Sequence, residues 1–147
     1  MTRIVRVAPA MLQEIAALEA LTFAQPWSEQ ALALLCGESA FGFAALCEDG
    51  VAAYGGMLTV LDEGQITNVA THPDHRRQGL AGRVLEALLT EARSRGLAFV
   101  TLEVRESNTA AIRLYEKFGF AAVGRRPRFY TGPTEAALVM QCDLVDM

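Results

Sequence analysis

The stretch from residue 76 to residue 82 combines two arginines with small side chains at the predicted start of a helix. The N-terminus of a helix presents unpaired backbone N–H groups and a partial positive charge, so it attracts anions. Because Gly79, Ala81 and Gly82 carry little or no side chain, a diphosphate could approach those N–H groups closely. The stretch by itself predicts only an anion site, since a basic surface turn before an ordinary helix would have the same composition.

The same stretch lacks the two common nucleotide-binding patterns. It contains neither the GxxxxGK[ST] of a P-loop nor the GxGxxG of a dinucleotide-binding fold. Among phosphate-containing ligands, this disfavours ATP and NAD.

Three residues further along the chain have side chains suited to binding or to proton transfer: Glu103, Asn108 and Tyr115. Glu103 belongs to an apolar stretch whose partly dry setting would raise the carboxyl pKa and make it a usable base. Tyr115 lies two helical turns after Asn108 on the same predicted face, where its phenol could protonate a departing thiolate. Each residue also has a purely structural interpretation, as an exposed strand-end glutamate, a helix N-cap or a core aromatic.

The spacing of apolar residues predicts the elements that must position these side chains. Before the basic stretch, we expect a strand at 4–7, a helix at 11–21, a second helix from the N-cap Ser28 to about 35, a hairpin of strands at 41–48 and 51–60 about an Asp-Gly turn, and a strand at 65–71. After it, we expect a helix from Leu80 to a stop at Gly96, a strand at 99–104, a helix from Asn108 to Gly119, and strands at 120–125 and 137–143.

This order predicts a single α/β (α+β) domain over residues 1–147, with one mixed sheet of about seven strands and about four helices. Two consecutive glycines, Gly55 and Gly56, interrupt the second strand of the hairpin. They predict a β-bulge or a close approach of the backbone to a neighbouring element.

The overall composition narrows the class of protein. The chain has 13 basic and 17 acidic residues and a net charge of −4, which disfavours a general attraction to nucleic acid. Its arginines nevertheless cluster at 76, 77 and 83 and at 125, 126 and 128, which suits a small anionic ligand. No apolar stretch approaches the ~20 residues that span a bilayer and no signal peptide is evident, so we expect a soluble, cytoplasmic protein.

The cysteines and histidines do not predict a metal site. Cys36, Cys47 and Cys142 have no metal-binding or disulfide-framework spacing, so we expect buried free thiols. His72 and His75 flank a Pro-Asp pair, and no third ligand lies near them in the sequence. We therefore expect a turn there and no bound metal.

The sequence around the basic stretch resembles the GNAT superfamily of acetyltransferases. The shared pattern is Arg/Gln-x-x-Gly-x-Gly/Ala between a strand and a helix, followed by a strand, an asparagine and a helix that bears a tyrosine. Within that superfamily the chain looks closely like the bacterial RimI type, which acetylates the N-terminal alanine of a small-subunit ribosomal protein. The matching stretches lie at 26–29, 68–70, 77–80, 102–105, 107–108, 110–112, 114–116 and 118–120. The resemblance spans nearly the whole chain and implies a mostly antiparallel sheet.

The resemblance implies acetyl-CoA as co-substrate and assigns residues to hold it. The strand backbone at Val69, Ala70 and Thr71 would bond the pantetheine arm and help to polarise the acetyl carbonyl. Asn108 would also contact the coenzyme. The pyrophosphate would be wrapped by the basic stretch, which consists of Arg76, Arg77, Gln78, Gly79, Leu80, Ala81 and Gly82.

The resemblance also implies a mechanism of direct attack by the acceptor amine. An α-amine has a pKa of about 7.7–8.0, so it must lose a proton before it attacks. Glu103 would be the general base and Tyr115 the general acid, while Trp27 and Tyr130 would line the acceptor side. The predicted acceptor is a protein N-terminus, in particular that of a basic ribosomal protein, and no direct contact with nucleic acid or membrane is expected.

Two departures from the RimI type fall on the acceptor side. RimI-type sequences typically carry Glu-Asp-Ala before the last strand, whereas this chain has Ala136 in place of the aspartate. Arg128 stands where a smaller or neutral residue is more usual. The absent aspartate at Ala136 keeps open transfer to a small amine such as a polyamine, aminoglycoside or amino acid. A non-catalytic acyl-CoA-binding module is the other alternative, and the joint presence of Glu103, Asn108 and Tyr115 argues against it.

Overall fold

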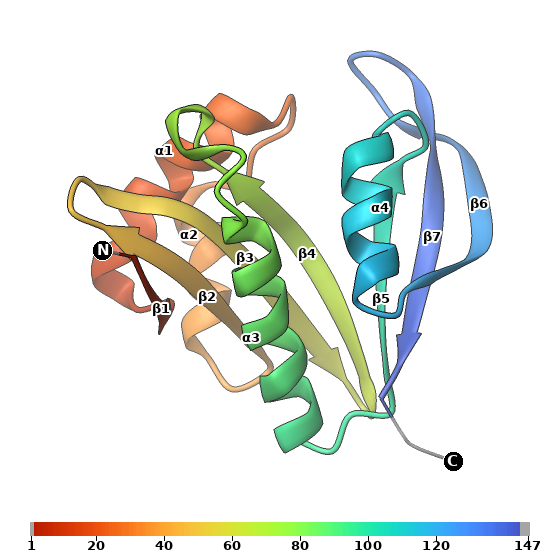
Figure 1. Cartoon of the computed structure of the whole chain (residues 1–147), viewed down its shortest axis with the longest axis horizontal. Helices are drawn as coiled ribbons and strands as arrows, with labels where there is room; N and C mark the ends of the chain where they lie inside the picture. The colour runs from red at the N-terminus through yellow and green to blue at the C-terminus, as the bar shows by residue number, and fades with distance from the viewer. Residues whose placement is uncertain (1, 145–147) are drawn as a thin grey trace.

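Seven strands form one sheet through the centre of the molecule, in the order β1-β2-β3-β4-β5-β7-β6 (Figure 1). The computed structural model describes residues 2–144. Along the chain, its elements are β1 (Arg3–Arg6), η1 (Pro9–Met11), α1 (Leu12–Thr22), α2 (Glu29–Leu32), η2 (Ala33–Cys36), β2 (Ala40–Cys47), β3 (Gly50–Val60), β4 (Glu63–Thr71), η3 (Pro73–His75), α3 (Leu80–Ser94), β5 (Phe99–Arg105), α4 (Thr109–Lys117), β6 (Ala121–Tyr130) and β7 (Glu135–Asp143). The predicted order of strands and helices is confirmed.

The two halves of the sheet meet at β4 and β5, the parallel pair in an otherwise antiparallel sheet. The two strands pair only where residues 63–65 lie beside residues 99–101. Beyond that point they diverge toward the C-terminal end of β4 (Figure 1). Within the described part of the chain, the edge of β4 that faces β5 therefore has no strand partner after Gln65.

A β-bulge lies where β4 leaves β5. Two residues of β4, at positions 67 and 68, oppose the single residue Gly56 of β3. A Cβ atom on Gly56 would lie 2.6 Å from the Oγ1 atom of Thr67, so any larger residue would force the neighbouring side chains to shift. The bulge and the close approach predicted from the glycine pair are both confirmed, and the extra residue belongs to the partner strand.

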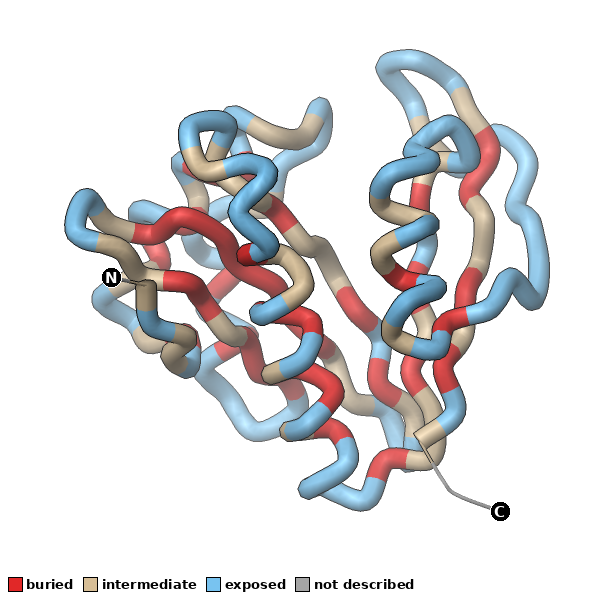
Figure 2. Tube along the Cα trace, in the orientation of Figure 1, coloured by how far each residue is buried: buried red, intermediate tan, exposed pale blue. Residues whose placement is uncertain are grey.

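Helices cover both faces of the sheet, and each face has an apolar core. Buried residues recur along α3 and the central strands (Figure 2). On one face α3 and α4 pack over the strands, and a Cβ on Gly55 would lie 2.9 Å from the side chains of Val84 and Leu88. Glycine at this position therefore lets α3 approach β3. On the other face, α1, α2 and η2 bury Ile15, Leu18, Leu32, Leu35 and Tyr54. No helix among residues 2–144 has the length and apolar character that crossing a membrane requires.

The predicted helix after Ser28 is shorter than expected. Its N-cap is confirmed, because the Ser28 Oγ atom accepts a hydrogen bond from the Ala31 N–H at 3.1 Å. The α-helix ends at Leu32 and continues as the 3₁₀ helix η2. Residues three apart eclipse in a 3₁₀ helix, which lets Leu32 and Leu35 point into the core together.

The expectation of three buried thiols is wrong for two of them. All three cysteines are free, but only Cys142 is buried. Cys36 is exposed because Leu32 and Leu35 occupy the buried side of η2. Cys47 is half-buried at the end of β2, next to the hairpin turn.

Candidate active site

The basic stretch lines a pocket of about 170 Å³ at the N-terminus of α3. Six of its seven residues contribute to the wall, and Gln78 is the exception. Thr71 joins them from the end of β4 and Leu114 from α4. The complete lining is Thr71, His75, Arg76, Arg77, Gly79, Leu80, Ala81, Gly82 and Leu114. The tertiary structure thus brings together most of the residues expected to hold a pyrophosphate.

The backbone of this stretch leaves N–H groups free for an anion. Gly79 precedes α3 with a φ of 74°, a left-handed conformation that glycine adopts without strain. Arg77 also has a positive φ, of 65°. No side chain among the described residues caps this end of α3, so the N–H groups of its first turn are available to a ligand. With two arginines in the same wall, the pocket fits the diphosphate of a coenzyme.

The exposed edge of β4 runs from the sheet bulge to this pocket. Val69, Ala70 and Thr71 pair with β3 along one edge. Their other edge faces the opening between β4 and β5, where the described chain supplies no strand. Unpaired N–H and C=O groups of an extended strand are suited to bond an extended ligand such as a pantetheine arm.

Asn108 caps α4, as its structural interpretation predicts. Its Oδ1 atom accepts a hydrogen bond from the Ala111 N–H at 3.2 Å. The residue is exposed, so the cap leaves its amide N–H₂ group accessible to a ligand.

Tyr115 is buried on the side of the sheet covered by α3 and α4, with 8% of its surface exposed. Its ring packs against Phe120 with the ring centroids 5.8 Å apart. Burial, and secondarily the neighbouring Tyr130, raises the pKa of the Tyr115 phenol to about 12. The phenol therefore keeps its proton at neutral pH, which a proton donor requires.

Glu103 does not have the partly dry setting expected from its strand. It is exposed, because its neighbours Leu102 and Val104 point into the core under α3 and α4. Strand alternation therefore directs Glu103 to the opposite face, where α1 and α2 lie. Burial raises the pKa of the Tyr130 phenol, and the charge of Glu103 is the second cause, so these two predicted site residues lie near each other.

The β6–β7 loop, which follows Tyr130, is held by residues to which no pattern in the sequence gave a role. The Arg105 guanidinium lies 4.6 Å from the centre of the Tyr130 ring and donates to the carbonyl oxygens of Thr131 and Pro133 at 2.8 and 2.9 Å. It also bonds the Glu135 carboxylate at 3.2 Å, which in turn accepts from the Ser107 N–H at 2.7 Å. No local pattern signals these contacts, because the bonded residues come from separate elements.

The buried residue Ala136 lies directly after this carboxylate in β7. In this chain Glu135 supplies a carboxylate that anchors the loop, so the aspartate missing at position 136 does not leave the loop unattached. Arg128 has a positive φ of 55° and lies in an irregular part of the edge strand β6.

Trp27 lies on the same face of the sheet as Glu103. It is half-buried and packs against the apolar core under α1 and α2. Its loop contacts the β6–β7 loop, since the Gln25 Nε2 atom donates to the Thr131 Oγ1 atom at 2.8 Å. The two loops predicted to lie on the acceptor side therefore meet, although 106 residues separate the bonded pair.

A buried carboxylate that sequence analysis did not single out fixes the Trp27 loop. Glu19 of α1 is completely buried and accepts hydrogen bonds from the Tyr54 hydroxyl, from Asn68 Nδ2 at 2.9 and 3.1 Å, and from the Trp27 N–H at 2.8 Å. A glutamate within an apolar helical pattern is the one signal that could have drawn attention to it.

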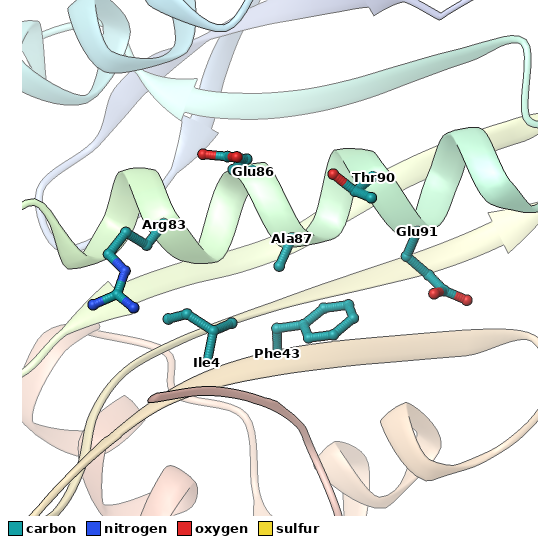
Figure 3. Close-up of a pocket in the computed structure, with 7 residues that line it drawn as sticks. All are labelled: Ile4, Phe43, Arg83, Glu86, Ala87, Thr90 and Glu91. Carbon is teal, nitrogen blue, oxygen red and sulfur yellow. The ribbon is translucent and has the colours of Figure 1, made fainter. Parts of the chain in front are cut away.

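A larger pocket of about 330 Å³ lies between α3 and the strands β1 and β2 (Figure 3). Ile4 and Phe43 form its floor, and none of its lining residues belongs to the predicted site. Its one arginine, Arg83, is accompanied by Glu86 and Glu91, so the wall does not suit a diphosphate.

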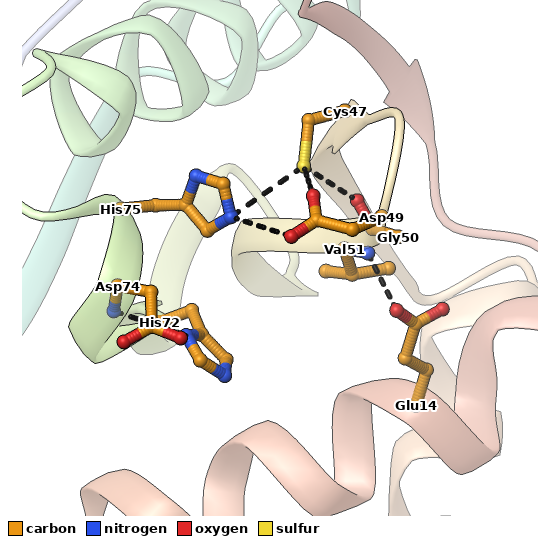
Figure 4. Close-up of polar contacts among 8 residues, drawn as sticks. All are labelled: Glu14, Cys47, Asp49, Gly50, Val51, His72, Asp74 and His75. Carbon is orange, nitrogen blue, oxygen red and sulfur yellow. Dashed lines mark hydrogen bonds and ion pairs between the residues drawn. The ribbon is translucent and has the colours of Figure 1, made fainter.

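The turn expected around His72 and His75 is present as η3, and the fold brings residues that are distant in the sequence to the His75 ring. The turn between β2 and β3 brings Cys47 and Asp49 beside its ring (Figure 4). Cys47 and Asp49 lie 28 and 26 positions before His75 in the chain. They become its neighbours only because the sheet places this turn against η3.

Comparison with known proteins agrees with the geometry. Residues 12–120 match the model of the Acetyltransferase (GNAT) family. The chain is 41% identical over 125 residues to the [ribosomal protein bS18]-alanine N-acetyltransferase of Escherichia coli (strain K12), with 84% of each chain covered. It is 39% identical over 127 residues to the enzyme of the same name from Salmonella typhimurium, again with 84% of each covered.

A solved structure shows the same fold. The crystal structure of the ribosomal-protein-S18-alanine N-acetyltransferase from Escherichia coli matches with a TM-score of 0.91 and 36% identity, covering 100% of this chain and 96% of that one. GNAT enzymes use acetyl-CoA, which fits the uncapped helix, the two arginines and the open strand edge described above. The chain therefore belongs to the acetyltransferase (GNAT) family, as an acetyl-CoA-dependent N-acetyltransferase of the RimI type.

Proposed function

We propose that this enzyme acetylates the α-amine of a protein N-terminus, with the N-terminal alanine of ribosomal protein bS18 as its acceptor. The 41% identity over 84% of the chain to the Escherichia coli enzyme named for that reaction supports the proposal. The reaction would take place in the cytoplasm, where ribosomal proteins are made.

The structural observation that carries the proposal is the contact between the two acceptor-side loops. Gln25 bonds Thr131, and the loops bear Trp27 and Tyr130 on the sheet face where Glu103 is exposed. An amine that reached Glu103 from this face would lie between these aromatic residues. Such a passage suits the extended end of a peptide, since backbone groups of two loops would be available to bond it.

In the proposed mechanism, the pocket at α3 holds the pyrophosphate and the β4 backbone at 69–71 holds the pantetheine arm. Glu103 accepts a proton from the α-ammonium group, through a water molecule because the carboxylate is exposed. The free amine attacks the thioester carbonyl and forms the C–N bond. As the C–S bond breaks, the nitrogen loses its second proton to water, which returns a proton to Tyr115 at the end of the cycle. The Tyr115 phenol, which holds its proton because burial raises its pKa to about 12, protonates the departing thiolate.

The acceptor is tested by incubating the purified enzyme with acetyl-CoA and a short peptide that begins Ala-Arg. Tandem mass spectrometry should place the acetyl group on the α-amine. A matched peptide with a blocked α-amine and a free lysine should stay unmodified. Acetylation of the lysine alone, or turnover of small amines without any peptide product, would overturn the proposal.

The role of Glu103 is tested in the same assay. Glu103→Gln should lower kcat by about 10²-fold or more with an unchanged Kd for acetyl-CoA, because the amide cannot accept the proton. Glu106→Gln is the matched control, since Glu106 lies just after the same strand and pairs with Arg125 at the surface. Equal rates in the two variants would remove the assignment of Glu103 as the base.

A small amine is the second candidate acceptor, and Ala136 favours it. The buried alanine leaves no carboxylate where the RimI type carries aspartate, which reduces the polar groups available to a peptide. A polyamine, an aminoglycoside and free amino acids should be compared with the peptide under identical conditions. A higher kcat/KM for any of them would make that amine the acceptor.

A further inference from the structure

Three different metal-ligating side chains converge at the turn between β2 and β3 (Figure 4). Cys47 ends β2, Asp49 lies in the turn, and His75 belongs to η3. One ligand atom from each residue lies within 4.8 Å of the other two. The thiol of Cys47 donates to the Asp49 carboxylate at 2.7 Å, and the His75 Nε2 atom lies 3.7 Å from the Cys47 sulfur and 3.4 Å from Asp49 Oδ2.

The spacing of these atoms matches the edges of a tetrahedral metal site. Zinc binds sulfur at about 2.3 Å and imidazole nitrogen at about 2.0 Å, so tetrahedral angles place the two ligand atoms about 3.5 Å apart. A nitrogen and a carboxylate oxygen on the same ion would lie about 3.4 Å apart. The distances of 3.7 and 3.4 Å from His75 Nε2 are close to both values. A small rotation of the Asp49 carboxylate would complete the set.

The backbone around the cluster is held on both sides. The Cys47 sulfur also donates to the Gly50 carbonyl at 3.2 Å, and the Val51 N–H donates to Glu14 Oε2 of α1 at 2.6 Å. The His75 N–H donates to the His72 carbonyl at 2.9 Å, which closes η3. Two anchored segments therefore face each other across the cluster. Asp49 is exposed and the other two residues are half-buried, so an ion and a water molecule can reach the fourth position.

A redox-active thiol is a weaker explanation for the cluster. The Cys47 sulfur faces the Asp49 carboxylate at 2.7 Å and the Gly50 carbonyl oxygen at 3.2 Å, whereas a reactive cysteine needs neighbours that stabilise its thiolate. Thiolate, imidazole and carboxylate together are the ligands that zinc prefers. With Cys47 ionised, the three ligands would carry two negative charges and neutralise a divalent ion.

We propose that Cys47, Asp49 and His75 form a binding site for Zn²⁺ or a similar borderline transition-metal ion, with water as the fourth ligand. The ion would join the β2–β3 turn to η3. His75 and the next residue, Arg76, also line the pocket at α3, so the ion would brace the segment that leads into the coenzyme site. The proposal does not depend on which amine the enzyme acetylates.

Co²⁺ alone is the probe that tests this site, because a cobalt–thiolate bond gives a charge-transfer band in the near ultraviolet. The reduced full-length protein should bind one equivalent of Co²⁺ with this band, and Zn²⁺ should displace it. Cys47→Ser should lose the band. Cys36→Ser is the matched control, since Cys36 is exposed outside the cluster, and it should keep the band. Absence of the band in the wild type, or its persistence in Cys47→Ser, would overturn the proposal.

The other two ligands are tested by Zn²⁺ affinity. His75→Ala and Asp49→Asn should each raise the Kd for Zn²⁺ by at least about tenfold, since even residues that only orient a ligand contribute that much. Asp49 is an exposed turn residue, so its amide variant is expected to fold, and circular dichroism checks this for all variants. Zn²⁺ should raise the Tm of the wild type and not of Cys47→Ser. Unchanged Kd values in both variants would contradict the site.

Discussion

Tyr115 and Glu103, the two residues proposed for proton transfer, lie in opposite environments. Tyr115 of α4 is buried between its helix and the sheet, and Glu103 is exposed on the other face of β5. Burial keeps the phenol protonated, as a donor requires, while access to water lets the carboxylate pass its proton to solvent. The two side chains could serve one reaction at the opening between β4 and β5, where a bound thioester would be reached from both faces of the sheet.

Tyr115→Phe should lower kcat by about 10²-fold or more, because the ring remains but the proton donor is lost. The Kd for acetyl-CoA should be unchanged, since Tyr115 does not line the pocket at α3. The protonated phenol is the active form. Because its pKa is raised to about 12, deprotonation of Tyr115 should not lower the wild-type kcat until the pH approaches that value. A pH–rate profile checks this. An alkaline decline at or below the ordinary tyrosine value of 10.0 that vanishes in Tyr115→Phe would contradict it.

At the scale of elements, the buried carboxylate of Glu19 connects α1 to β3, to β4 and to the loop that follows α1. Its partners are Tyr54, Asn68 and the Trp27 backbone. The hydrogen bond to Asn68 comes from the bulged part of β4, just before the strand edge expected to bind the coenzyme. Burial of the Tyr54 phenol, and secondarily the charge of the Glu19 carboxylate that it faces, raises the pKa of Tyr54. One side chain thus holds both β4 and the loop that bears Trp27.

Glu19→Ala should lower the free energy of unfolding by about 3 kcal/mol or more, because the buried Tyr54 hydroxyl and two half-buried donors lose their acceptor. It should also lower kcat/KM for the peptide, since the Trp27 loop loses its anchor. Glu14→Ala is the matched control on the same helix. Glu14 also accepts from a backbone N–H, that of Val51, but it is exposed, so its loss should cost about 1 kcal/mol. Urea denaturation measures both, and similar losses in the two variants would show that Glu19 has no special role.

At the scale of the whole molecule, charged contacts fasten the outer parts of the sheet. Glu91 of α3 bonds Arg95 and pairs with Arg6 of β1 at 2.7 Å, and Glu106 bonds Arg125 of β6 at 2.6 Å. Glu135 bonds Ser107 and Arg105. Hydrogen bonds from Arg95, Arg125 and Ser107, respectively, are the largest causes that lower the carboxyl pKa values of these glutamates.

Acid should therefore weaken the fold through these three carboxylates. A carboxyl group whose pKa is lower in the folded protein than in the unfolded chain stabilises the fold at pH values above its unfolded pKa, here 4.5. This stabilisation is lost as the pH falls through the pKa of the folded state. The Tm should stay nearly constant from pH 7 to about pH 5 and then fall toward about pH 3. Glu135→Gln should reduce that fall, whereas Glu38→Gln should not, because the Glu38 side chain is exposed and only its backbone carbonyl contacts Arg95. Calorimetry at each pH checks this; a Tm that is unchanged at about pH 3 would contradict it.

Local patterns in the sequence were sufficient for most of the fold. Apolar residues at helical spacing predicted α1, α3 and α4, and the Asp-Gly pair predicted the hairpin of β2 and β3. These features depend on neighbours within a few residues, so they are readable without tertiary structure. The same holds for the basic stretch, because the anion affinity of a helix N-terminus is a property of its own backbone.

Contacts between distant residues could not be predicted in this way, since they depend on strand order and on which face each helix covers. Alternation along β5 predicts that Glu103 points to one face of the sheet and its two neighbours to the other. Only the packing of α3 and α4 determines which of these faces is buried at β5. The clamp of Arg105 on the β6–β7 loop and the burial of Glu19 depend likewise on long-range packing. Cys47, Asp49 and His75 meet because the sheet sets one turn against another. The sequence determined the elements and the anion-binding stretch; the tertiary structure decided which side chains share a site.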